Sequence, residues 1–463
     1  MMQGNTLHHP SSSNRVRLRA YLLAFGSVSG LLIGCGSNDD SNTEKIQSEV
    51  SYWNDVVPIF EQSCLQCHQQ GGIAPFRLDT FEEASKWAPQ IADATREGTM
   101  PPWYATNDGS CGKFTNTNEL SAKQIELLGA WDDQGAPEGE RDGREIEVPE
   151  LPGIDSPVEY QTPSIVPEIQ GGDLAEFDEY RCFPIAAGLD RPQFITAYDV
   201  KPGTPAIVHH VIAYIVEPEG ESRTPGVTNA EVMDALDAES PDRDGWPCFA
   251  DAGDGINTAA ATVTWAPGQG VVKFPGDSGV LLAPTQTLVV QMHYNLADPS
   301  VRGQMDQTTL EFEMTDLVPN IGTMVAEDQL LASLYDDEPI TLDPGQAEVT
   351  ETWSNSFGEM VGPNISGGKV WGFMPHMHEL GSTYRLTMKS NGSESCGVDV
   401  QNWDFNWQRM YFLETPFEVD ADSEIEVKCT YDTRSKTAPV LPGWGTRNEM
   451  CTGIMYVTFP LPS

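Results

Sequence analysis

The stretch AIVHHVIAYIV, residues 206–216, indicates the fold of the larger part of the chain. It is a run of β-branched and aromatic residues between turn residues, which is typical of a β-strand. Similar runs occur at residues 193–200, 287–295 and 424–431, and glycine and proline separate them. Sustained over about 300 residues, this pattern predicts antiparallel β-sandwiches rather than a parallel α/β sheet, and the length favours two of them.

Residues 51–137 show a different, helical pattern. Thr80 with Glu83 and Ser121 with Gln124 are spaced as the capping pairs that open helices. The second helix is expected to place three apolar residues on one face: Ile125, Leu128 and Trp131. The predicted fold class is therefore mixed, with a small all-α domain followed by two all-β, jelly-roll-like sandwich domains.

Length and composition place the domain boundaries. A chain of 463 residues is long enough for several domains of about 100 to 200 residues each. Residues 139–163 are rich in proline, glycine and acidic residues, which suits a linker. We therefore expect, in order, a targeting segment at 1–35, a tether at 36–50, the helical domain at 51–138, the linker, and β-domains at 164–315 and 316–463.

The chain is strongly acidic. It has 69 acidic and 26 basic residues, and its formal net charge is −43. Such a charge repels phosphate backbones, so we expect no nucleic-acid partner. The simplest interpretation is that the acidity keeps an exported protein soluble.

The first 35 residues have the features of an export signal. Three arginines precede an apolar run at residues 20–33, which is too short to span a bilayer comfortably. The run ends in LIGC at residues 32–35, which resembles the bacterial lipobox and predicts lipidation of Cys35. An ordinary cleaved signal peptide is the alternative. The predicted product is an exported lipoprotein on the periplasmic side of a membrane or at the cell surface, held to the membrane by lipid.

The sequence CLQCH, residues 64–68, is the C-x-x-C-H pattern of c-type haem attachment. In that pattern both thiols, here Cys64 and Cys67, bind the porphyrin, and the histidine, here His68, becomes an axial iron ligand. A redox pair followed by a histidine is the alternative. Met100 is the candidate sixth ligand, although it could also be core filling. The region resembles a class I cytochrome c domain, which implies one covalent haem c.

Five further histidines lie in apolar, strand-like runs after the linker: His209, His210, His293, His376 and His378. Uncoordinated imidazoles in such runs would need other polar partners, so their clustering indicates metal binding. His376 and His378 are two residues apart, which places both rings on one face of a strand. His209 and His210 are adjacent, so they can bind one ion together only at a bulge or a strand end.

The motifs that contain these histidines resemble, in order, the ligand motifs of the ascorbate-dependent type II copper monooxygenases. The motifs are VHHV at 208–211, QMHY at 291–294, HMH at 376–378 with Gly381, and EMC at 449–451. The resemblance covers about residues 165–463 and implies two copper ions. It assigns His209, His210 and His293 to an electron-transfer site, and His376, His378 and Met450 to the oxygen-activating, catalytic site. A soft thioether favours Cu(I), which agrees with the second assignment.

The same resemblance pairs Cys429 with Cys451 in a disulfide, and Cys182 with Cys248 in another. Cys111 and Cys396 are left open, either paired with each other or free. The chain departs from the peptide-hydroxylating members at two positions that bind the substrate carboxylate, where it has Met374 and Ile454. A desolvated carboxylate without a partner is costly, so a more apolar substrate is expected.

The function that the resemblance implies is hydroxylation of a carbon–hydrogen bond of a small organic substrate with O2. The reaction needs two electrons, and the fused haem is the expected one-electron donor. A quinol-linked or periplasmic cytochrome, or an ascorbate-like reductant, would in turn reduce the haem. The main alternative is a non-enzymatic lipoprotein that transfers electrons or binds copper. A carbohydrate- or protein-binding sandwich with structural metals is a third interpretation, which leaves the haem motif unexplained.

Overall fold

The structure is a computed structural model. It describes residues 49–461 except for 71–73, 116, 149–152, 172–176, 249–251, 268, 363–366, 391, 406 and 444–446. Cys35 and the predicted targeting segment lie outside the described residues, so the expectation of a lipid anchor stays a prediction. Within the part that is described, no helix is long and apolar enough to cross a membrane.

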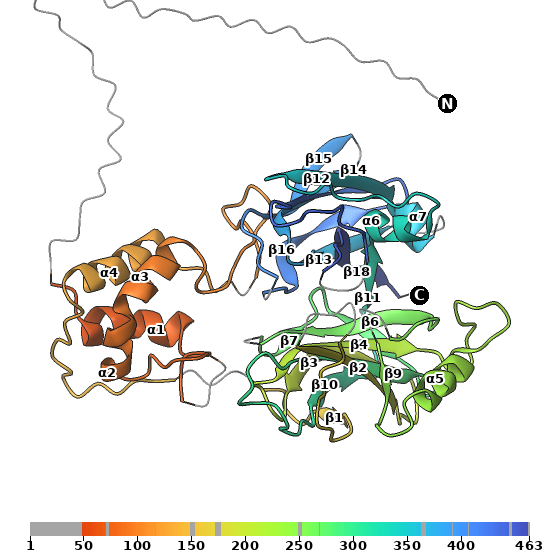
Figure 1. Cartoon of the computed structure of the whole chain (residues 1–463), viewed down its shortest axis with the longest axis horizontal. Helices are drawn as coiled ribbons and strands as arrows, with labels where there is room; N and C mark the ends of the chain where they lie inside the picture. The colour runs from red at the N-terminus through yellow and green to blue at the C-terminus, as the bar shows by residue number, and fades with distance from the viewer. Residues whose placement is uncertain are drawn as a thin grey trace, which may run out of the picture. The chain divides into compact units, whose positions relative to one another are not determined.

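The regular elements between residues 49 and 148 are helical (Figure 1). They are the π-helix η1 Tyr52–Val56, α1 Val57–Ser63, α2 Phe81–Ala84, the 3₁₀-helix η2 Ser85–Trp87, α3 Ala88–Arg96 and α4 Ala122–Asp133. Both predicted caps are present, because the side chains of Thr80 and Ser121 accept hydrogen bonds from the backbone of Glu83 and Gln124. Helix α4 buries two of its three predicted core residues fully: Leu128 and Trp131.

The chain after α4 turns back onto the helices. The Pro137 carbonyl accepts hydrogen bonds from the backbone N–H of Tyr52 and from the indole of Trp131. Further along, Arg144 pairs with Glu61 at 2.6 Å. Part of the predicted linker at 139–163 therefore packs on the helical region, because its few apolar and basic side chains find partners there.

The N-terminal β-sandwich packs two sheets around one core. The first sheet has the order β5-β2-β9-β4-β6, formed by β2 Asp178–Ala186, β4 Val208–Val216, β5 Trp246–Pro247, β6 Thr258–Trp265 and β9 Thr287–Asn295. The facing sheet contains β1 Val158–Gln161, β3 Gln193–Lys201, β7 Val272–Lys273, β8 Ser278–Leu282 and β10 Thr309–Thr315. Helix α5 Asn229–Ala238 lies between β4 and β5 in the sequence.

Strand β1 is a second part of the predicted linker that has regular structure or packing. Its residues lie within 139–163, yet Val158 pairs with Phe312 and Tyr160 with Leu310 of β10. Tyr160 is buried and its hydroxyl donates to the Ala187 carbonyl. Two alternating apolar residues in a tetrapeptide are too short a pattern to predict a strand within a proline- and acid-rich stretch, so the pairing partner decides its structure.

The C-terminal β-sandwich also has two sheets around one core. One has the order β12-β17-β14-β15, formed by β12 Val349–Ser356, β14 Gly381–Ser390, β15 Ser393–Val400 and β17 Glu424–Tyr431. The other contains β11 Asn320–Glu327, β13 Gly368–His376, β16 Tyr411–Val419 and β18 Thr452–Pro460. Short helices follow β11 and β12, namely α6 Gln329–Ala332, η3 Ser333–Tyr335 and α7 Phe357–Val361.

The two sandwiches share one continuous sheet. Strands β8 and β11 pair in parallel through Ser278 with Asn320 and Gly279 with Ile321. This joint connects the β1-β10-β3-β8 strands to the β11-β18-β13-β16 strands. It also joins the two sandwiches through hydrogen bonds between backbones.

Residues 103–115, which we call the docking segment, belong in space to the C-terminal sandwich. Ala105 forms a bridge with Val400 of β15, and Phe114 forms one with Leu413 of β16. Trp103, Ala105 and Phe114 are part of the hydrophobic core of this sandwich. The helical region is thereby attached to the C-terminal sandwich.

Among the described residues, three disulfides are formed. Cys182 bonds Cys248, and Cys429 bonds Cys451, which confirms both pairings that the family resemblance implies. Cys111 bonds Cys396, which resolves the pair that the sequence leaves open and ties the docking segment to β15.

Candidate metal centre

The first histidine cluster lies on two neighbouring strands. Along β4 and β9 the pairing runs from Val208 with Tyr294 directly to His210 with His293, so His209 is the extra residue of a β-bulge. A bulge re-aims a side chain that would otherwise point to the opposite face. The bulge that joint binding of one ion by His209 and His210 would require is therefore present.

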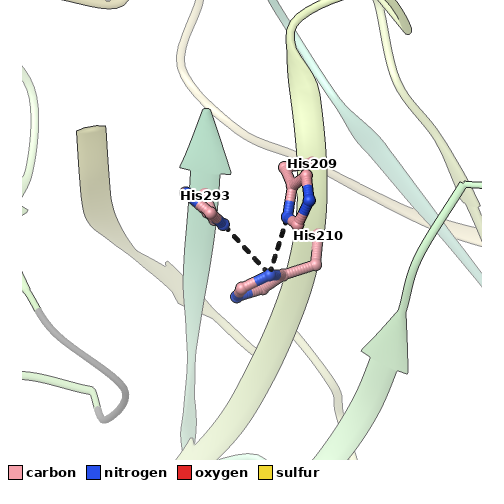
Figure 2. A group of neighbouring side chains, drawn as sticks. All are labelled: His209, His210 and His293. Carbon is pink, nitrogen blue, oxygen red and sulfur yellow. Dashed lines mark hydrogen bonds between the residues drawn. The ribbon is translucent and has the colours of Figure 1, made fainter. Parts of the chain in front are cut away.

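The three rings of this cluster converge (Figure 2). The Nδ1 atom of His210 lies 3.4 Å from Nδ1 of His209 and 3.1 Å from Nδ1 of His293. One nitrogen from each ring can be chosen so that all three lie within 4.8 Å of one another. Three imidazole nitrogens at this spacing can bind a single metal ion.

The surroundings of the first cluster favour neutral imidazoles. Burial lowers the pKa of both His210 and His293 well below the usual value, and the neighbouring histidines lower it further. The ring of Tyr180 stacks on His293 with 4.0 Å between ring centroids. Neutral imidazoles keep a lone pair available for a metal.

A buried carboxylate stands next to this cluster. Oδ1 of Asp178 lies 3.2 Å from Nε2 of His293, but the angle does not make a hydrogen bond, and that buried nitrogen has none among the described residues. Burial raises the pKa of Asp178 to about 6. A buried ring nitrogen without a hydrogen bond is costly, and an ion bound at this cluster would offset that cost. The donor set and its environment fit copper.

The second pair of histidines lies at a strand end. His376 is the last residue of β13, and His378 lies two residues beyond it. Their ring centroids are 5.1 Å apart, while the intervening Met377 is buried in the core. The prediction that both stand inside one strand is wrong for His378, although the alternation that places their rings together persists past the strand end.

Side chains hold this second pair in place. Nδ1 of His376 bonds Oε1 of Gln408, and Nδ1 of His378 lies 3.0 Å from the Asn448 carbonyl. A carbonyl acceptor requires the proton on Nδ1, so Nε2 is the nitrogen whose lone pair could bind a metal. The indole of Trp403 donates to the His378 carbonyl at 3.1 Å.

Glu449 supports the turn that follows His378. Its two carboxylate oxygens accept hydrogen bonds from the backbone of His378 at 2.9 Å and of Leu380 at 2.7 Å. Burial raises the pKa of Glu449 to about 8. Both oxygens are thus used by the backbone that carries the second pair.

Met450 lies close to the same strand end. It is buried, its carbonyl accepts from the Tyr431 hydroxyl at 2.7 Å, and it precedes Cys451 of the third disulfide. Two residues later Thr452 pairs with His376, which brings the Met450 backbone near the second pair. The same register places Met374 directly opposite Ile454.

The predicted haem motif forms one turn after α1. The backbone N–H groups of Cys67 and His68 both donate to the Cys64 carbonyl, at 3.2 and 3.0 Å. Cys64 and Cys67 are the free cysteines of the described part, and burial raises the pKa of Cys64 to about 12. Nδ1 of His68 lies 3.1 Å from the Phe76 carbonyl, which again makes Nε2 the nitrogen that could bind iron. These two thiols and this imidazole are the groups that the predicted covalent haem would use.

Met100 follows the last residue of α3, Arg96, by four positions and is partly exposed. Within the described ranges, no hydrogen bond or ring contact joins it to His68. Sequence reasoning missed Asp178 and Gln408, because nothing in their local patterns marks them. Glu449 was visible only as a neighbour of Met450.

Comparisons with known proteins agree with the C-terminal geometry. Residues 329–460 match the model of the copper type II ascorbate-dependent monooxygenase C-terminal domain. Tyramine beta-hydroxylase of Caenorhabditis briggsae is 24% identical over 207 residues, which cover 42% of this chain and 33% of that protein. DBH-like monooxygenase protein 1 of Gallus gallus is 26% identical over 196 residues, 40% of this chain and 31% of that protein.

The chain thus spans about a third of the length of these curated relatives. Among solved structures, a subviral particle of infectious bursal disease virus VP2 aligns with 68% of this chain and 74% of that chain at 10% identity. Its TM-score of 0.19 is too low to indicate a shared fold. The similarity to the copper type II ascorbate-dependent monooxygenases thus lies in residues 329–460, which match the C-terminal domain of that family.

Proposed function

We propose that this protein is a copper-dependent monooxygenase that hydroxylates a carbon–hydrogen bond of an organic substrate with O2. The observation that carries the proposal is the convergence of His209, His210 and His293 on one point, in a chain whose C-terminal domain matches that family. Burial lowers the pKa of His210 and His293 and so favours their neutral form. Imidazoles have no structural need to face one another in this way, whereas a metal site requires it.

The two histidine groups would have different roles. His209, His210 and His293 would hold a copper that only passes electrons, and His376, His378 and Met450 would hold the copper at which O2 reacts. When bound, copper would supply one-electron transfer at the first group and oxygen activation at the second. The protein's contribution is to favour the neutral form of His210, His293 and His376 through burial, which lowers the pKa of each. Gln408 orients His376, and the Asn448 carbonyl orients His378.

The substrate is proposed to be apolar where it meets the second pair. Met374 and Ile454 face each other across β13 and β18 and contribute to the apolar surface of the N-terminal core. Neither side chain can pair with a carboxylate, and removing an unpaired carboxylate from water is costly. This surface therefore favours an alkyl or aromatic group over an acidic one.

The electrons are proposed to come from a c-type haem bound by Cys64, Cys67 and His68, with Met100 as the sixth ligand. Inserting one oxygen atom and releasing the other as water consumes two electrons and two protons. When bound, haem would supply a one-electron carrier, which matches delivery in two single steps. A quinol-linked or periplasmic cytochrome, or an ascorbate-like reductant, would reduce it.

The protein is further proposed to be an exported lipoprotein anchored through Cys35 on the periplasmic side of a membrane or at the cell surface. The apolar run before LIGC and the three disulfides of the described part support export, because disulfides persist in oxidising compartments. Metabolic labelling with palmitate tests the anchor. We expect the native chain to be labelled and membrane-bound, and the Cys35→Ala variant to be unlabelled and soluble. A soluble, unlabelled native chain would exclude the lipid anchor.

Oxygen uptake tests the enzymatic proposal. The reduced, copper-loaded full chain is mixed with a panel of apolar, amine and carboxylate substrates, and product is identified by mass spectrometry with labelled O2. We expect one labelled oxygen atom in an apolar product. Copper bound in stoichiometric amount with no substrate-dependent uptake would instead indicate a non-enzymatic copper protein.

A second measurement tests the haem. Mass spectrometry of the native chain, expressed with haem-attachment machinery, is expected to show one covalent haem, and the Cys64→Ser, Cys67→Ser variant none. If the variant turned over at the native rate with the reductant that serves the native chain, the haem would not be the donor.

A further inference from the structure

The docking segment brings the chain around Met100 near the second histidine pair. We call this part of the helical region, residues 99–102, the Met100 side. Two backbone hydrogen bonds hold the docking segment. The N–H of Thr106 donates to the Asp399 carbonyl, and the N–H of Thr115 donates to the Phe412 carbonyl, each at 2.8 Å. The ring of Trp103 packs edge-on against Tyr411 at 5.1 Å. Together with the disulfide to Cys396, these contacts fix the position of the chain that begins three residues after Met100.

A cavity of about 350 Å³ opens where the two parts meet. Thr99, which follows α3, and Tyr104 of the docking segment line it, together with Trp403, Asp404 and Phe405 of the C-terminal sandwich. Burial, and next the Asp404 carboxylate, raise the pKa of Tyr104. The residues that flank Met100 therefore lie across one cavity from Phe405.

Phe405 in turn lies between the two histidine groups. Its ring centroid is 5.9 Å from that of His378 and 6.3 Å from that of His209. Its carbonyl accepts a hydrogen bond from Nε2 of Gln408 at 2.9 Å, and Oε1 of the same amide bonds His376. One phenyl ring thus contacts both groups, and the side chain that fixes its backbone also orients the second pair.

We propose that Phe405 is a positioning residue for electron transfer, and that its ring forms the contact through which electrons from the Met100 side reach both histidine groups. The proposal rests on the proposed function, because it needs the haem and both coppers. Each transfer oxidises a ferrous haem by one electron and reduces one Cu(II) to Cu(I), so no further reagent is required. A packed ring also excludes water from the space between the two histidine groups. Water in that space would have to reorient each time an electron moved.

The test measures electron transfer directly and does not use turnover. The full chain, loaded with haem and with oxidised copper, is kept free of oxygen, and its haem is reduced by a light flash. Haem absorbance then follows its reoxidation, and freeze-quenched electron paramagnetic resonance follows the loss of Cu(II). Phe405→Leu removes the ring and keeps apolar bulk, Phe405→Tyr keeps the ring, and Phe417→Leu changes a phenylalanine that packs on Phe373.

We expect Phe405→Leu to slow haem reoxidation about tenfold, with Phe405→Tyr and Phe417→Leu within about twofold of the native chain. Copper content and the resting Cu(II) spectrum should stay unchanged in all three variants. A native rate in Phe405→Leu, or an equal slowing in Phe417→Leu, would overturn the proposal. A native chain without a covalent haem band would overturn the proposed haem donor and this inference together, which distinguishes that failure from the failure of the inference alone.

Discussion

The two histidine groups are held by different means. His209, His210 and His293 belong to paired strands, so backbone hydrogen bonds and one bulge set their spacing. His376 and His378 lie at and beyond a strand end, where Gln408, Glu449 and the Asn448 carbonyl set their orientation. A sheet holds its residues rigidly, whereas a turn supported by side chains can adjust. The comparison indicates that the first group suits an unchanging site, and the second suits a site whose coordination changes.

The largest expected effect separates the chemistry of the two groups. Met450→Ala should lower product formation about a thousandfold or more, because the second site would lose the soft ligand that we propose for it. Product formation is measured with labelled O2, and the Cu(II) spectrum of the first group should stay native. Met360→Ala, which removes a thioether from α7 of the same sandwich, is the control and should turn over normally. Native turnover in Met450→Ala would remove this residue from the site.

The next effect tests the side-chain support of the second group. Glu449→Gln leaves one oxygen where two are used, so the backbone N–H of His378 or Leu380 loses its acceptor. Copper affinity at the second group should fall about 10- to 100-fold, with the first group unaffected. Titration against a competing chelator measures both affinities. Glu351→Gln, which changes a partly buried carboxylate on β12, is the matched control. Equal losses of copper affinity at both groups in Glu449→Gln would contradict the idea that side chains support only the second group.

A smaller effect is expected at the first group, where the backbone carries most of the geometry. Asp178→Asn removes the charge that lies 3.2 Å from Nε2 of His293. Copper affinity there should drop about tenfold, since partners of ligand histidines tune metal binding. The same chelator titration checks it, with the exposed Asp316→Asn as control. If Asp178→Asn lowered copper affinity at the first group more than Glu449→Gln lowers it at the second, the first group would be the one that depends more on side chains.

The smallest expected effect concerns folding. A Cβ at Gly381 would lie 2.6 Å from Trp403 and 2.9 Å from Met377, so Gly381→Ala should cost about 1 to 3 kcal/mol of unfolding free energy. Gly129 in α4 has room for a Cβ, and Gly129→Ala should stabilise the chain by about 1 kcal/mol. Denaturant unfolding measures the loss of unfolding free energy in Gly381→Ala and the gain in Gly129→Ala. Equal stability would show that the turn after His378 adapts without cost.

Much of the site is visible in local patterns. The five histidines, Met450 and the C-x-x-C-H turn can be read from residue spacing and family motifs, and the need for a bulge at His209 follows from strand alternation alone. The caps at Thr80 and Ser121 are equally local. The strand at Val158–Gln161 was missed, because four residues of alternation inside a proline- and acid-rich stretch are too few to be recognised without the partner strand.

The sequence by itself determined which residue types are available for copper and haem, and the alternating runs that become sheets. Only the tertiary structure decided that Cys111 bonds Cys396, that the docking segment joins the C-terminal core, and that Phe405 lies between the two histidine groups. The physical reason is range. Side-chain periodicity and capping act over a few residues, whereas these contacts join residues hundreds of positions apart, whose proximity depends on how whole sheets pack.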